Sequence, residues 1–398
     1  MNVASMISFT AVLIVLLEVG YLFLLAMAST RRPSAVVKRE PLTRFAIVIP
    51  AHDEASVIAA TVNRLHSLDY PAELFAIHIV ADHCSDETAT LARQAGAIVH
   101  ERDSGPRSGK GAALAWLFER ILTGPYDAVV VFDSDTQVDS NFLRVMDARL
   151  AQGAQVVQGQ HIIRNPESGW FPALTWAMFL IDNRIQNLGR SNLGWSAKNM
   201  GDSICFRADI LRRLGWGEGL TEDYQLRQRL LLAGIKISYE PQAKGYGEAP
   251  RTWAQARAQR ARWLRGTRMA SRQLARQLLL TAIRRRDLTM LDGALQAYLP
   301  SYSTLTVVGI AALVIQLLLN RLVGPVIPPT LIYTWIGVCV ALFVYPLFGL
   351  VLERAPARAY FVILTGPIFV LWRTVLAIRS RYSRQPVVWI RTTHGETK

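Results

Sequence analysis

The chain has 398 residues, 51% of them hydrophobic, and its 44 Lys and Arg residues against 30 Asp and Glu residues give a formal net charge of +14. A positive mean hydropathy of +0.21 excludes intrinsic disorder and is unusual for a soluble protein that carries so much charge. The three cysteines, Cys84, Cys205 and Cys339, are too scattered for a disulfide framework or a zinc site. We therefore expect membrane segments combined with one large basic domain that faces a reducing aqueous compartment.

The first apolar run covers residues 6–27 and contains one charge, Glu18. It is long enough to cross about 30 Å of hydrocarbon. Basic residues follow the run instead of preceding it, which is typical of an anchor and not of a cleaved signal peptide: Arg31, Arg32, Lys38 and Arg39. By the positive-inside rule, the N-terminus would lie outside and the following domain in the cytoplasm.

Two further spans are expected at 299–319 and 331–352, joined by a Pro-rich turn. A weaker apolar segment, 360–378, is interrupted by Gly366-Pro367 and would either cross or re-enter. We favour four crossings, although these place a basic tail outside, against the charge rule; its charges are Arg379, Arg381, Arg384, Arg391 and Lys398. The expected division is an anchor at 1–30, an aqueous domain at 42–250, basic interface helices at 251–296, membrane helices at 297–380 and the tail at 381–398.

Short runs rich in Val, Ile and Ala begin at Phe45, Ala76 and Ala128 and stop abruptly at polar residues or proline, which predicts buried parallel strands. Stretches with helical spacing lie beside them at 56–68, 87–96 and 109–122. This alternation predicts an α/β sheet, in which ligands bind beyond the carboxyl ends of the strands. Polar residues cluster at those ends: Pro50-Ala51-His52-Asp53-Glu54, Asp82-His83-Cys84-Ser85-Asp86 and Asp133-Ser134-Asp135.

Asp133 and Asp135 could together hold a hard divalent cation, which would neutralise a diphosphate. An Asp-rich turn that caps the next helix explains the same pattern, and both interpretations stay open. Gly109-Lys110-Gly111 opens a helix, where backbone N–H groups and an ammonium can meet an anion, but a plain helix start explains it equally well. Its spacing is not that of a P-loop.

Thr221-Glu222-Asp223 follows a Gly-rich turn. Thr221 could be a simple N-cap of the next helix, or a carboxylate held there could act as a general base on a hydroxyl nucleophile. The spacing of the seven histidines does not match a zinc site, and neither a G-x-S-x-G elbow nor a kinase signature is present.

Gln259-Arg260-Ala261-Arg262-Trp263 lies in a helix that is expected to start near residue 252. The arginine-rich run 251–286, next to membrane segments, mainly indicates contact with anionic headgroups. Arg262 offers a fixed fork for a diphosphate, and Trp263 offers an indole face for a sugar ring. The amphipathic segment 170–193 fits either an interfacial helix that guides a lipid or glycan, or ordinary core packing.

In this order and spacing, the motifs resemble those of the membrane-bound family 2 glycosyltransferases, which include cellulose, chitin and hyaluronan synthases and ceramide glucosyltransferase. The resemblance covers about 45–266 and the membrane layout. It implies an α/β fold of the GT-A type, with a mixed, mostly parallel sheet inserted between N-terminal and C-terminal transmembrane helices. The domain at 42–250 would be the glycosyltransferase domain.

The resemblance also implies the site. Asp223 would be the catalytic base, and Asp133 with Asp135 would hold Mg²⁺ or Mn²⁺. The donor would contact Pro50, Ala51, Asp53, Glu54, Asp82, Lys110 and Asp133. The diphosphate and acceptor would contact Glu222, Gln259, Arg262 and Trp263. Two departures stand out: Asp53 replaces the usual Asn, and segment 194–206 does not match the acceptor loop of cellulose synthase, so acceptor identity does not carry over.

The expected function is inverting, metal-dependent transfer from a nucleotide-sugar donor, a UDP-sugar, to a growing polysaccharide at the cytoplasmic face of the plasma (inner) membrane, with other polysaccharide-export subunits as partners. Transfer of one sugar to a lipid acceptor is the alternative. A basic membrane-tethered protein that binds polyanions without chemistry is a different class, but the acidic strand ends would repel a polyanion, so we expect no nucleic acid partner. Nucleotidyl transfer on a similar sheet would release pyrophosphate instead.

Overall fold

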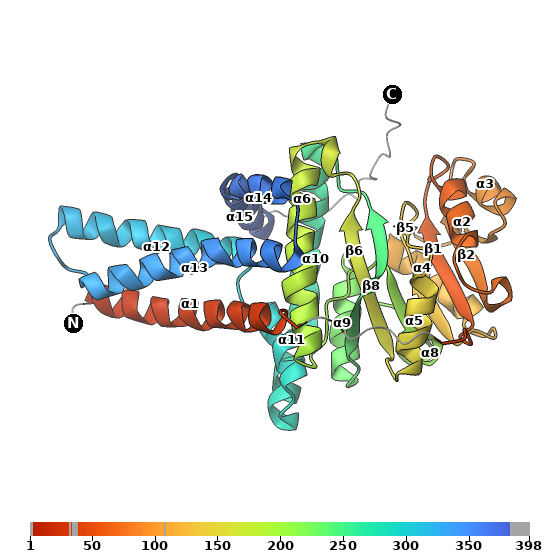
Figure 1. Cartoon of the computed structure of the whole chain (residues 1–398), viewed down its shortest axis with the longest axis horizontal. Helices are drawn as coiled ribbons and strands as arrows, with labels where there is room; N and C mark the ends of the chain where they lie inside the picture. The colour runs from red at the N-terminus through yellow and green to blue at the C-terminus, as the bar shows by residue number, and fades with distance from the viewer. Residues whose placement is uncertain (1–2, 32, 34–38, 107–108, 383–398) are drawn as a thin grey trace.

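The computed structural model describes residues 3–31, 33, 39–106 and 109–382 of the chain. The predicted charges at Arg32, Lys38, Arg384, Arg391 and Lys398 lie outside these residues. From the N-terminus onward, the helices and strands are (Figure 1) α1 (Val3–Ala28), β1 (Phe45–Ala51), α2 (Ile58–His66), η1 (Ala72–Leu74), β2 (Phe75–Asp82), α3 (Thr88–Gln94), β3 (Ile98–Arg102), α4 (Lys110–Ile121), β4 (Ala128–Val131), β5 (Gln137–Val138), α5 (Phe142–Ala151), β6 (Val156–Ile163), η2 (Pro166–Ser168), α6 (Trp170–Ile181), η3 (Asp182–Leu188), α7 (Gly189–Asn192), β7 (Ile204–Arg207), α8 (Ala208–Leu214), α9 (Glu222–Leu232), β8 (Ile237–Gly247), α10 (Trp253–Arg285), α11 (Leu288–Tyr298), α12 (Tyr302–Leu322), α13 (Pro329–Glu353), α14 (Ala357–Leu364) and α15 (Gly366–Tyr382).

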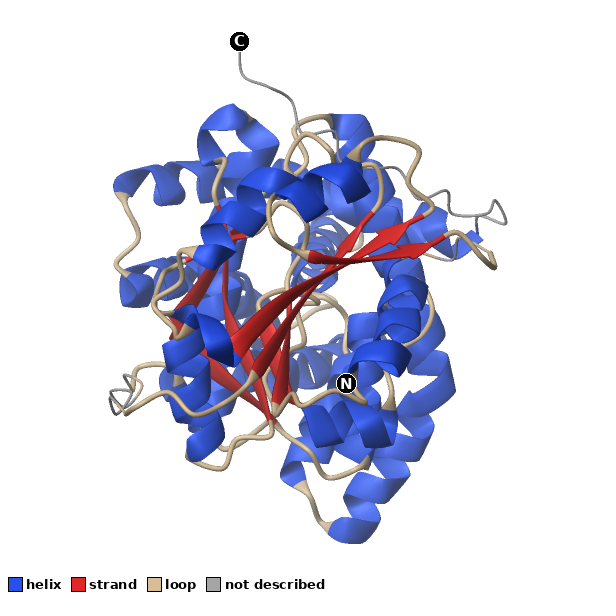
Figure 2. Cartoon of the chain, turned by 90° about the vertical axis from the view of Figure 1, so that its right-hand side faces the viewer, coloured by secondary structure: helices blue, strands red, loops and turns tan. Residues whose placement is uncertain are grey.

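An eight-stranded sheet in the order β3-β2-β1-β4-β7-β6-β8-β5 forms the centre of the aqueous part (Figure 2). Neighbouring strands pair in parallel from β3 to β4 and between β6 and β8, whereas β7 and β5 run against their neighbours. The predicted mixed, mostly parallel α/β sheet is therefore confirmed. Because β2, β1 and β4 are parallel neighbours, their carboxyl ends lie at the same edge.

Both faces of the sheet are covered by helices, which explains why β1 and β4 are apolar at every position. Phe45, Ile47 and Ile49 of β1 pack in one buried cluster with α2 and α5. The alternate residues Ala46 and Val48 point to the other face and pack with α4 and α9. This two-sided burial is the main source of stability for the sheet.

The three predicted strands and the helices beside them are present, with ends within two residues of those expected. The remaining strands have no apolar run of the same kind. β6 contains Gln158, Gly159 and Gln160, and β8 contains Pro241. Pairing between β6 and β8 shifts register after Gly159, where an added Cβ would lie 2.5 Å from the carbonyl oxygen of Ala243.

Three helices, α1, α12 and α13, are long and apolar enough to cross a membrane. They lie side by side and project away from the sheet domain (Figure 1). The weaker apolar segment forms α14 and α15, which are bent by 52° at their junction and count as a fourth span only if the pair is one broken helix. The predicted first residue of the second span moves from 299 to Tyr302, because Pro300 precedes the N-cap Ser301.

The long apolar helix α1 touches the sheet domain backbone to backbone. A Cβ built on Gly189 of α7 would lie 2.3 Å from the carbonyl oxygen of Leu25, so only glycine permits this approach. Leu25 itself is fully buried. The short helix after η3 therefore fixes the position of α1 against the domain.

We expect Gly189→Ala to destabilise the protein by about 1–3 kcal/mol, because the new methyl group must displace backbone on one side. Thermal unfolding of the purified full chain in detergent measures this. Gly337→Ala is the matched control, since Gly337 is also helical and nothing lies within 4 Å of its built Cβ. Equal unfolding temperatures for the two variants would contradict the close approach.

Candidate active site

A cavity of about 1580 Å³ extends from the carboxyl edge of the sheet to the membrane helices. Five of the predicted site residues line it: Asp133, Asp135, Asp223, Gln259 and Trp263. They come from three separate parts of the chain. The cavity is therefore the feature around which the other predicted residues can be placed.

Asp133 lies two residues after the end of β4 and accepts a hydrogen bond from the ammonium of Lys110, the first residue of α4. Lys110 also donates to the carbonyl oxygen of Gly201 at 2.6 Å. Burial alone would lower the pKa of Lys110, but the charges of Asp133 and Glu222 raise it, so this lysine stays charged. The backbone of Gly109 has φ +99°, which favours glycine at the position before the helix.

Asp202 and His161 were not predicted, yet they hold the acidic end of the cavity together. Asp202 accepts hydrogen bonds from the backbone N–H of Asp133 at 2.9 Å and from the Thr136 hydroxyl at 3.0 Å. Its other oxygen lies 2.7 Å from Nδ1 of His161. Burial would raise the pKa of Asp202, but His161 and Lys110 lower it to about 2, so this carboxylate remains ionised.

The start of α9 carries the predicted Glu222 and Asp223. Thr221 occupies the N-cap position, but its side chain makes no capping hydrogen bond, and its hydroxyl has no partner among the residues that the structure describes. Simple capping by Thr221 is therefore not what the structure shows. Instead, the Asp223 Oδ1 accepts a hydrogen bond from the backbone N–H of Tyr224 at 2.8 Å, in the first turn of α9.

Glycines allow three helices to meet at this point. A Cβ on Gly217 would lie 1.9 Å from the carbonyl oxygen of Glu222, and one on Gly111 of α4 would lie 3.1 Å from the Glu222 Cβ. A Cβ on Gly266 of α10 would lie 2.7 Å from the side-chain atoms of Thr221. The start of α9 is thus enclosed by the Gly-rich turn, α4 and α10.

Helix α10 begins with a capping box in which Thr252 and Gln255 exchange hydrogen bonds. It brings Arg262 to the turn before α9, where Nη1 donates to the carbonyl oxygen of Leu220 at 3.1 Å. Trp263 lines the cavity one residue later. The predicted motif residues of α10 therefore lie next to the predicted base.

The other predicted donor residues lie at the ends of β1 and β2 and do not line the cavity. Asp53 has φ +54° and accepts from the N–H of Ser85 at 2.7 Å, so the unusual Asp at this position caps the neighbouring loop. Asp82 is buried and bound by Arg102 and His83. Glu54 is buried as well, while Pro50 and Ala51 pair with β2 inside the sheet.

Two groups of side chains could hold a cation. His52, Asp53 and Cys84 offer ligand atoms within 4.8 Å of one another, a convergence that histidine spacing in the sequence did not predict. Burial raises the pKa of the Cys84 thiol, however, and a protonated thiol is a poor ligand. Asp133 and Asp135 offer only carboxylate oxygens, which Mg²⁺ and Mn²⁺ prefer, so these two fit the expected metal better.

Charge is distributed unevenly along the cavity. Its lining at the sheet end is acidic, with Asp133, Asp135, Asp202, Asp223 and Glu248. Apart from Glu18 and Asp182, the rest of the charged lining is basic, with Arg190, Lys198, Arg227, Arg260, Arg268, Arg272, Arg276 and Arg373. An acidic end suits a cation and its bound diphosphate, and a basic end suits an anion.

Comparison with known proteins identifies the family. A family model described as "Glycosyltransferase like family 2" matches residues 41–266, more than half of the chain. The chain belongs to this family of glycosyltransferases. The predicted motifs from Pro50 to Trp263 all fall inside the matched region, and the expectation of an enzyme is therefore confirmed.

Relatives of this glycosyltransferase act on different acceptors, judging by their names. It is 29% identical over 232 residues to a beta-monoglucosyldiacylglycerol synthase from Trichormus variabilis, covering 55% of this chain and 48% of that one. It is 27% identical over 238 residues to a poly-beta-1,6-N-acetyl-D-glucosamine synthase from Staphylococcus aureus, covering 57% and 55%. The chain thus spans about half the length of these curated relatives.

A solved mannosyltransferase from Pyrobaculum calidifontis, in complex with GDP-Man and Mn²⁺, matches over 96% of this chain and 99% of its own, with a TM-score of 0.56 and 15% identity. At that identity the likeness shows a shared fold. Because it extends over nearly all of both chains, the match includes the helices that flank the GT-A domain of the glycosyltransferase.

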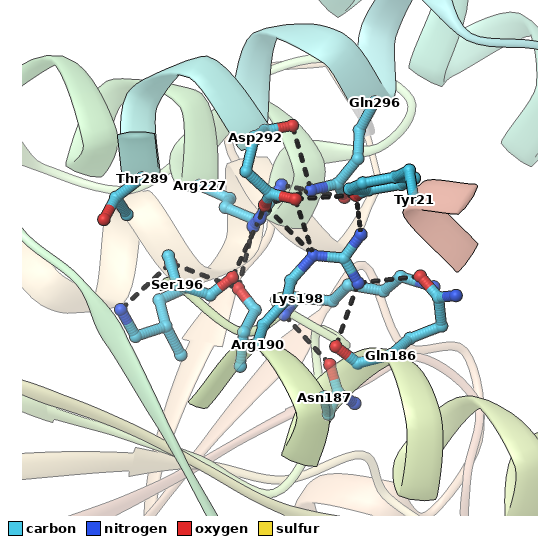
Figure 3. Close-up of polar contacts among 12 residues, drawn as sticks. Tyr21, Gln186, Asn187, Arg190, Ser196, Lys198, Arg227, Thr289, Asp292 and Gln296 are labelled. Carbon is cyan, nitrogen blue, oxygen red and sulfur yellow. Dashed lines mark hydrogen bonds and ion pairs between the residues drawn. The ribbon is translucent and has the colours of Figure 1, made fainter. Parts of the chain in front are cut away.

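A buried polar network connects the first membrane helix of the glycosyltransferase to α9 (Figure 3). The Tyr21 hydroxyl of α1 donates to Asp292 at 2.6 Å, and Arg190 donates to Asp292 at 3.0 Å. Arg227 of α9 lies 3.6 Å from the same carboxylate and donates to Gln296 at 3.2 Å. Asp292 therefore neutralises two buried arginines and ties α1 and α11 to the helix that carries Asp223.

We expect Asp292→Asn to lower the stability of the full chain by about 3 kcal/mol, because it leaves Arg190 and Arg227 buried without a counter-charge. Thermal unfolding in detergent measures the change. Asp209→Asn is the matched control, since the Asp209 side chain is 59% exposed and pairs only at the surface. Similar unfolding temperatures for the two variants would refute the role of the network.

The contribution of Glu222 to the stability of the folded protein should depend on pH. Burial and then the charge of Asp223 raise the pKa of Glu222 to about 7. The folded state therefore binds a proton that the unfolded state releases near the ordinary value of 4.5, so this residue's contribution to stability falls as pH rises toward 7. We expect Glu222→Gln to gain in unfolding temperature over the wild type between those pH values, with no further gain above. A constant difference across that range would show that Glu222 titrates normally.

Proposed function

We propose that this glycosyltransferase carries out inverting, metal-dependent transfer from a nucleotide-sugar donor, a UDP-sugar, to an acceptor presented from the membrane. The single observation that carries the proposal is the cavity, which joins Asp133, Asp135 and Asp223 to the membrane helices. A donor bound at the acidic end and an acceptor entering from the bilayer would meet at Asp223.

Donor binding would rest on residues at the sheet edge. Asp53, Glu54 and Asp82 would contact the nucleoside, and Asp133 with Asp135 would hold Mg²⁺ or Mn²⁺. When bound, the metal would neutralise negative charge on the diphosphate. Lys110, which already contacts Asp133, would lie near the nucleotide. Support for a metal comes from the carboxylate-only donor set and from the Mn²⁺ and GDP-Man bound in the mannosyltransferase of similar fold.

Asp223 would act as the base. Its burial raises its pKa, which makes it a better proton acceptor than an exposed aspartate. It would take the proton from an acceptor hydroxyl while that oxygen attacks the sugar carbon opposite the leaving group. The bond from the sugar to the diphosphate breaks in the same step, and Arg262, whose charge acts on Asp223, would stabilise the departing nucleoside diphosphate.

The apolar lining favours a lipid or a lipid-linked acceptor. Ile310, Val314 and Phe343 of the membrane helices form one wall, and Phe179 of α6 forms another. The glucosyldiacylglycerol synthase relative supports a lipid acceptor. Extension of a polysaccharide, which the sequence motifs favour, is the second candidate acceptor reaction. The poly-N-acetylglucosamine synthase relative supports it. Trp263 at the cavity surface could stack on a sugar in either case.

The proposed location is the cytoplasmic face of the plasma (inner) membrane. The basic residues Arg31 and Arg39 follow α1 and contact the sheet domain, Arg31 through the Asn192 amide and Arg39 through Asp147. Helix α1 begins at the far end of the helix bundle (Figure 1). The positive-inside rule then places the domain at 42–250 in the cytoplasm. For a polysaccharide product, partners would include other export subunits.

We expect full-length protein in lipid nanodiscs to release nucleoside diphosphate from one member of a panel of UDP- and GDP-sugars, with Mn²⁺ or Mg²⁺ present. Asp223→Asn should reduce the rate at least about 100-fold, because no base then accepts the proton. Chelation should abolish release, and the surface variant Asp209→Asn should retain it. A panel-wide lack of release, together with no donor binding by calorimetry, would refute the proposal. Release of pyrophosphate would indicate nucleotidyl transfer instead.

A further inference from the structure

Arg260 lies on α10 inside the predicted motif, yet no role had been assigned to it. Its side chain is only 8% exposed and lines the cavity. Its Cζ lies 4.7 Å from the centre of the Trp263 ring and 6.0 Å from that of Phe171. Within the described part of the chain, no atom accepts a hydrogen bond from its Nε or Nη2. A buried guanidinium with unused donors requires an acceptor from elsewhere.

Arg373 of α15 lines the same cavity and acts on Arg260 as a like charge. Burial, followed by the charge of Arg373, lowers the pKa of Arg260 to about 9. Across residues 3–31, 33, 39–106 and 109–382, no carboxylate forms an ion pair with either arginine. The negative charge of Asp182 attracts both arginines, but the Asp182 carboxylate forms its ion pair with Lys198. Among the described residues, two arginines thus line one cavity without a paired carboxylate.

A phosphate group suits this arrangement. The planar fork of each guanidinium can donate two parallel hydrogen bonds to its oxygens, and the double positive charge matches a phosphomonoester or phosphodiester. The surroundings are apolar as well: Phe171 and Phe369 pack beside Arg260 in a cluster formed by α6, α10 and α15. From there the cavity continues along Ile310, Val314 and Phe343 of the membrane helices.

We infer that Arg260 and Arg373 bind the phosphate of an anionic lipid whose tail lies along the membrane-helix wall of the cavity. This lipid is the membrane-borne acceptor, or carries it, and in that respect the inference rests on the proposed function. The diphosphate of the donor is the other source of phosphate. We favour the lipid because two of the three aromatic neighbours of Arg260, Phe171 and Phe369, come from α6 and α15, the third, Trp263, comes from α10 itself, and none comes from the carboxyl edge of the sheet.

Binding measurements on the full-length protein in neutral detergent test the inference. The probes are dioleoylphosphatidic acid, dioleoylglycerol with the same tails but no phosphate, and UDP with Mn²⁺. We expect Arg260→Gln and Arg373→Gln each to weaken phosphatidic acid binding about 10- to 100-fold, as expected for a lost charged hydrogen bond, and to leave dioleoylglycerol and UDP binding unchanged. Arg257→Gln, an exposed arginine on the same helix, should change none of the three.

Loss of UDP affinity in Arg260→Gln would overturn the inference and assign the pair to the donor. An equal loss of affinity for phosphatidic acid and dioleoylglycerol would also overturn it. So would phosphatidic acid binding by Arg260→Gln that is as tight as binding by Arg257→Gln. In lipid-free detergent, Arg260→Gln should also unfold at a higher temperature than the wild type, because it removes an uncompensated buried charge. A lower temperature would assign Arg260 to packing. Intact phosphatidic acid selectivity without any sugar transfer would refute the proposed function and support this inference.

Discussion

The close meeting of α4, α9 and α10 at Glu222 is the constraint on which the site depends. Glycine stands at each contact: a side chain at Gly217 would collide with the backbone of Glu222, one at Gly266 would collide with Thr221, and one at Gly111 would press against the Glu222 side chain. The same three segments supply Lys110, Asp223 and Arg262, whose charges act on one another. Close packing of backbone therefore fixes the distances between a cation, a candidate base and a second cation more firmly than flexible side chains could.

The cavity is lined by two kinds of charge. Its acidic carboxylates are held by the protein itself, as Asp202 shows by accepting from Asp133, Thr136 and His161. Its basic membrane end is less completely neutralised. With the proposed cation at the acidic end, the two ends would bind the diphosphate of the proposed donor and the phosphate of the proposed lipid at separate places.

The sequence predicted best where a strand is buried on both faces. The run from Phe45 is apolar at consecutive positions, so its strand and the polar residues after it could be recognised without the structure. β6 and β8 could not, because Gln158, Gln160 and Lys244 interrupt the apolar pattern in the strands that supply His161, Ile163 and Gly247 to the cavity lining. Local propensity failed at these strands because their environment is part of the site.

The same distinction applies to single residues. Asp133 and Asp135 stood out by their spacing, and Arg262 and Trp263 by the motif. Asp202 and His161 carry no local signal, since their importance arises from contacts between β6, β7 and the end of β4. Arg260 was hidden among many arginines, and only its burial distinguishes it. Roles that depend on long-range packing were thus beyond the reach of sequence patterns.

The network around Asp292 also has a practical meaning for handling the protein. Tyr21 belongs to the first membrane helix, whereas Arg227 belongs to the helix that carries Asp223. A soluble version that lacks α1 would remove the Tyr21 hydroxyl and uncover the Gly189 contact, and one that ends before α11 would leave two arginines unneutralised. The glycosyltransferase domain shares buried contacts with α1 and α11, and the enzyme is therefore best produced and studied with these helices attached.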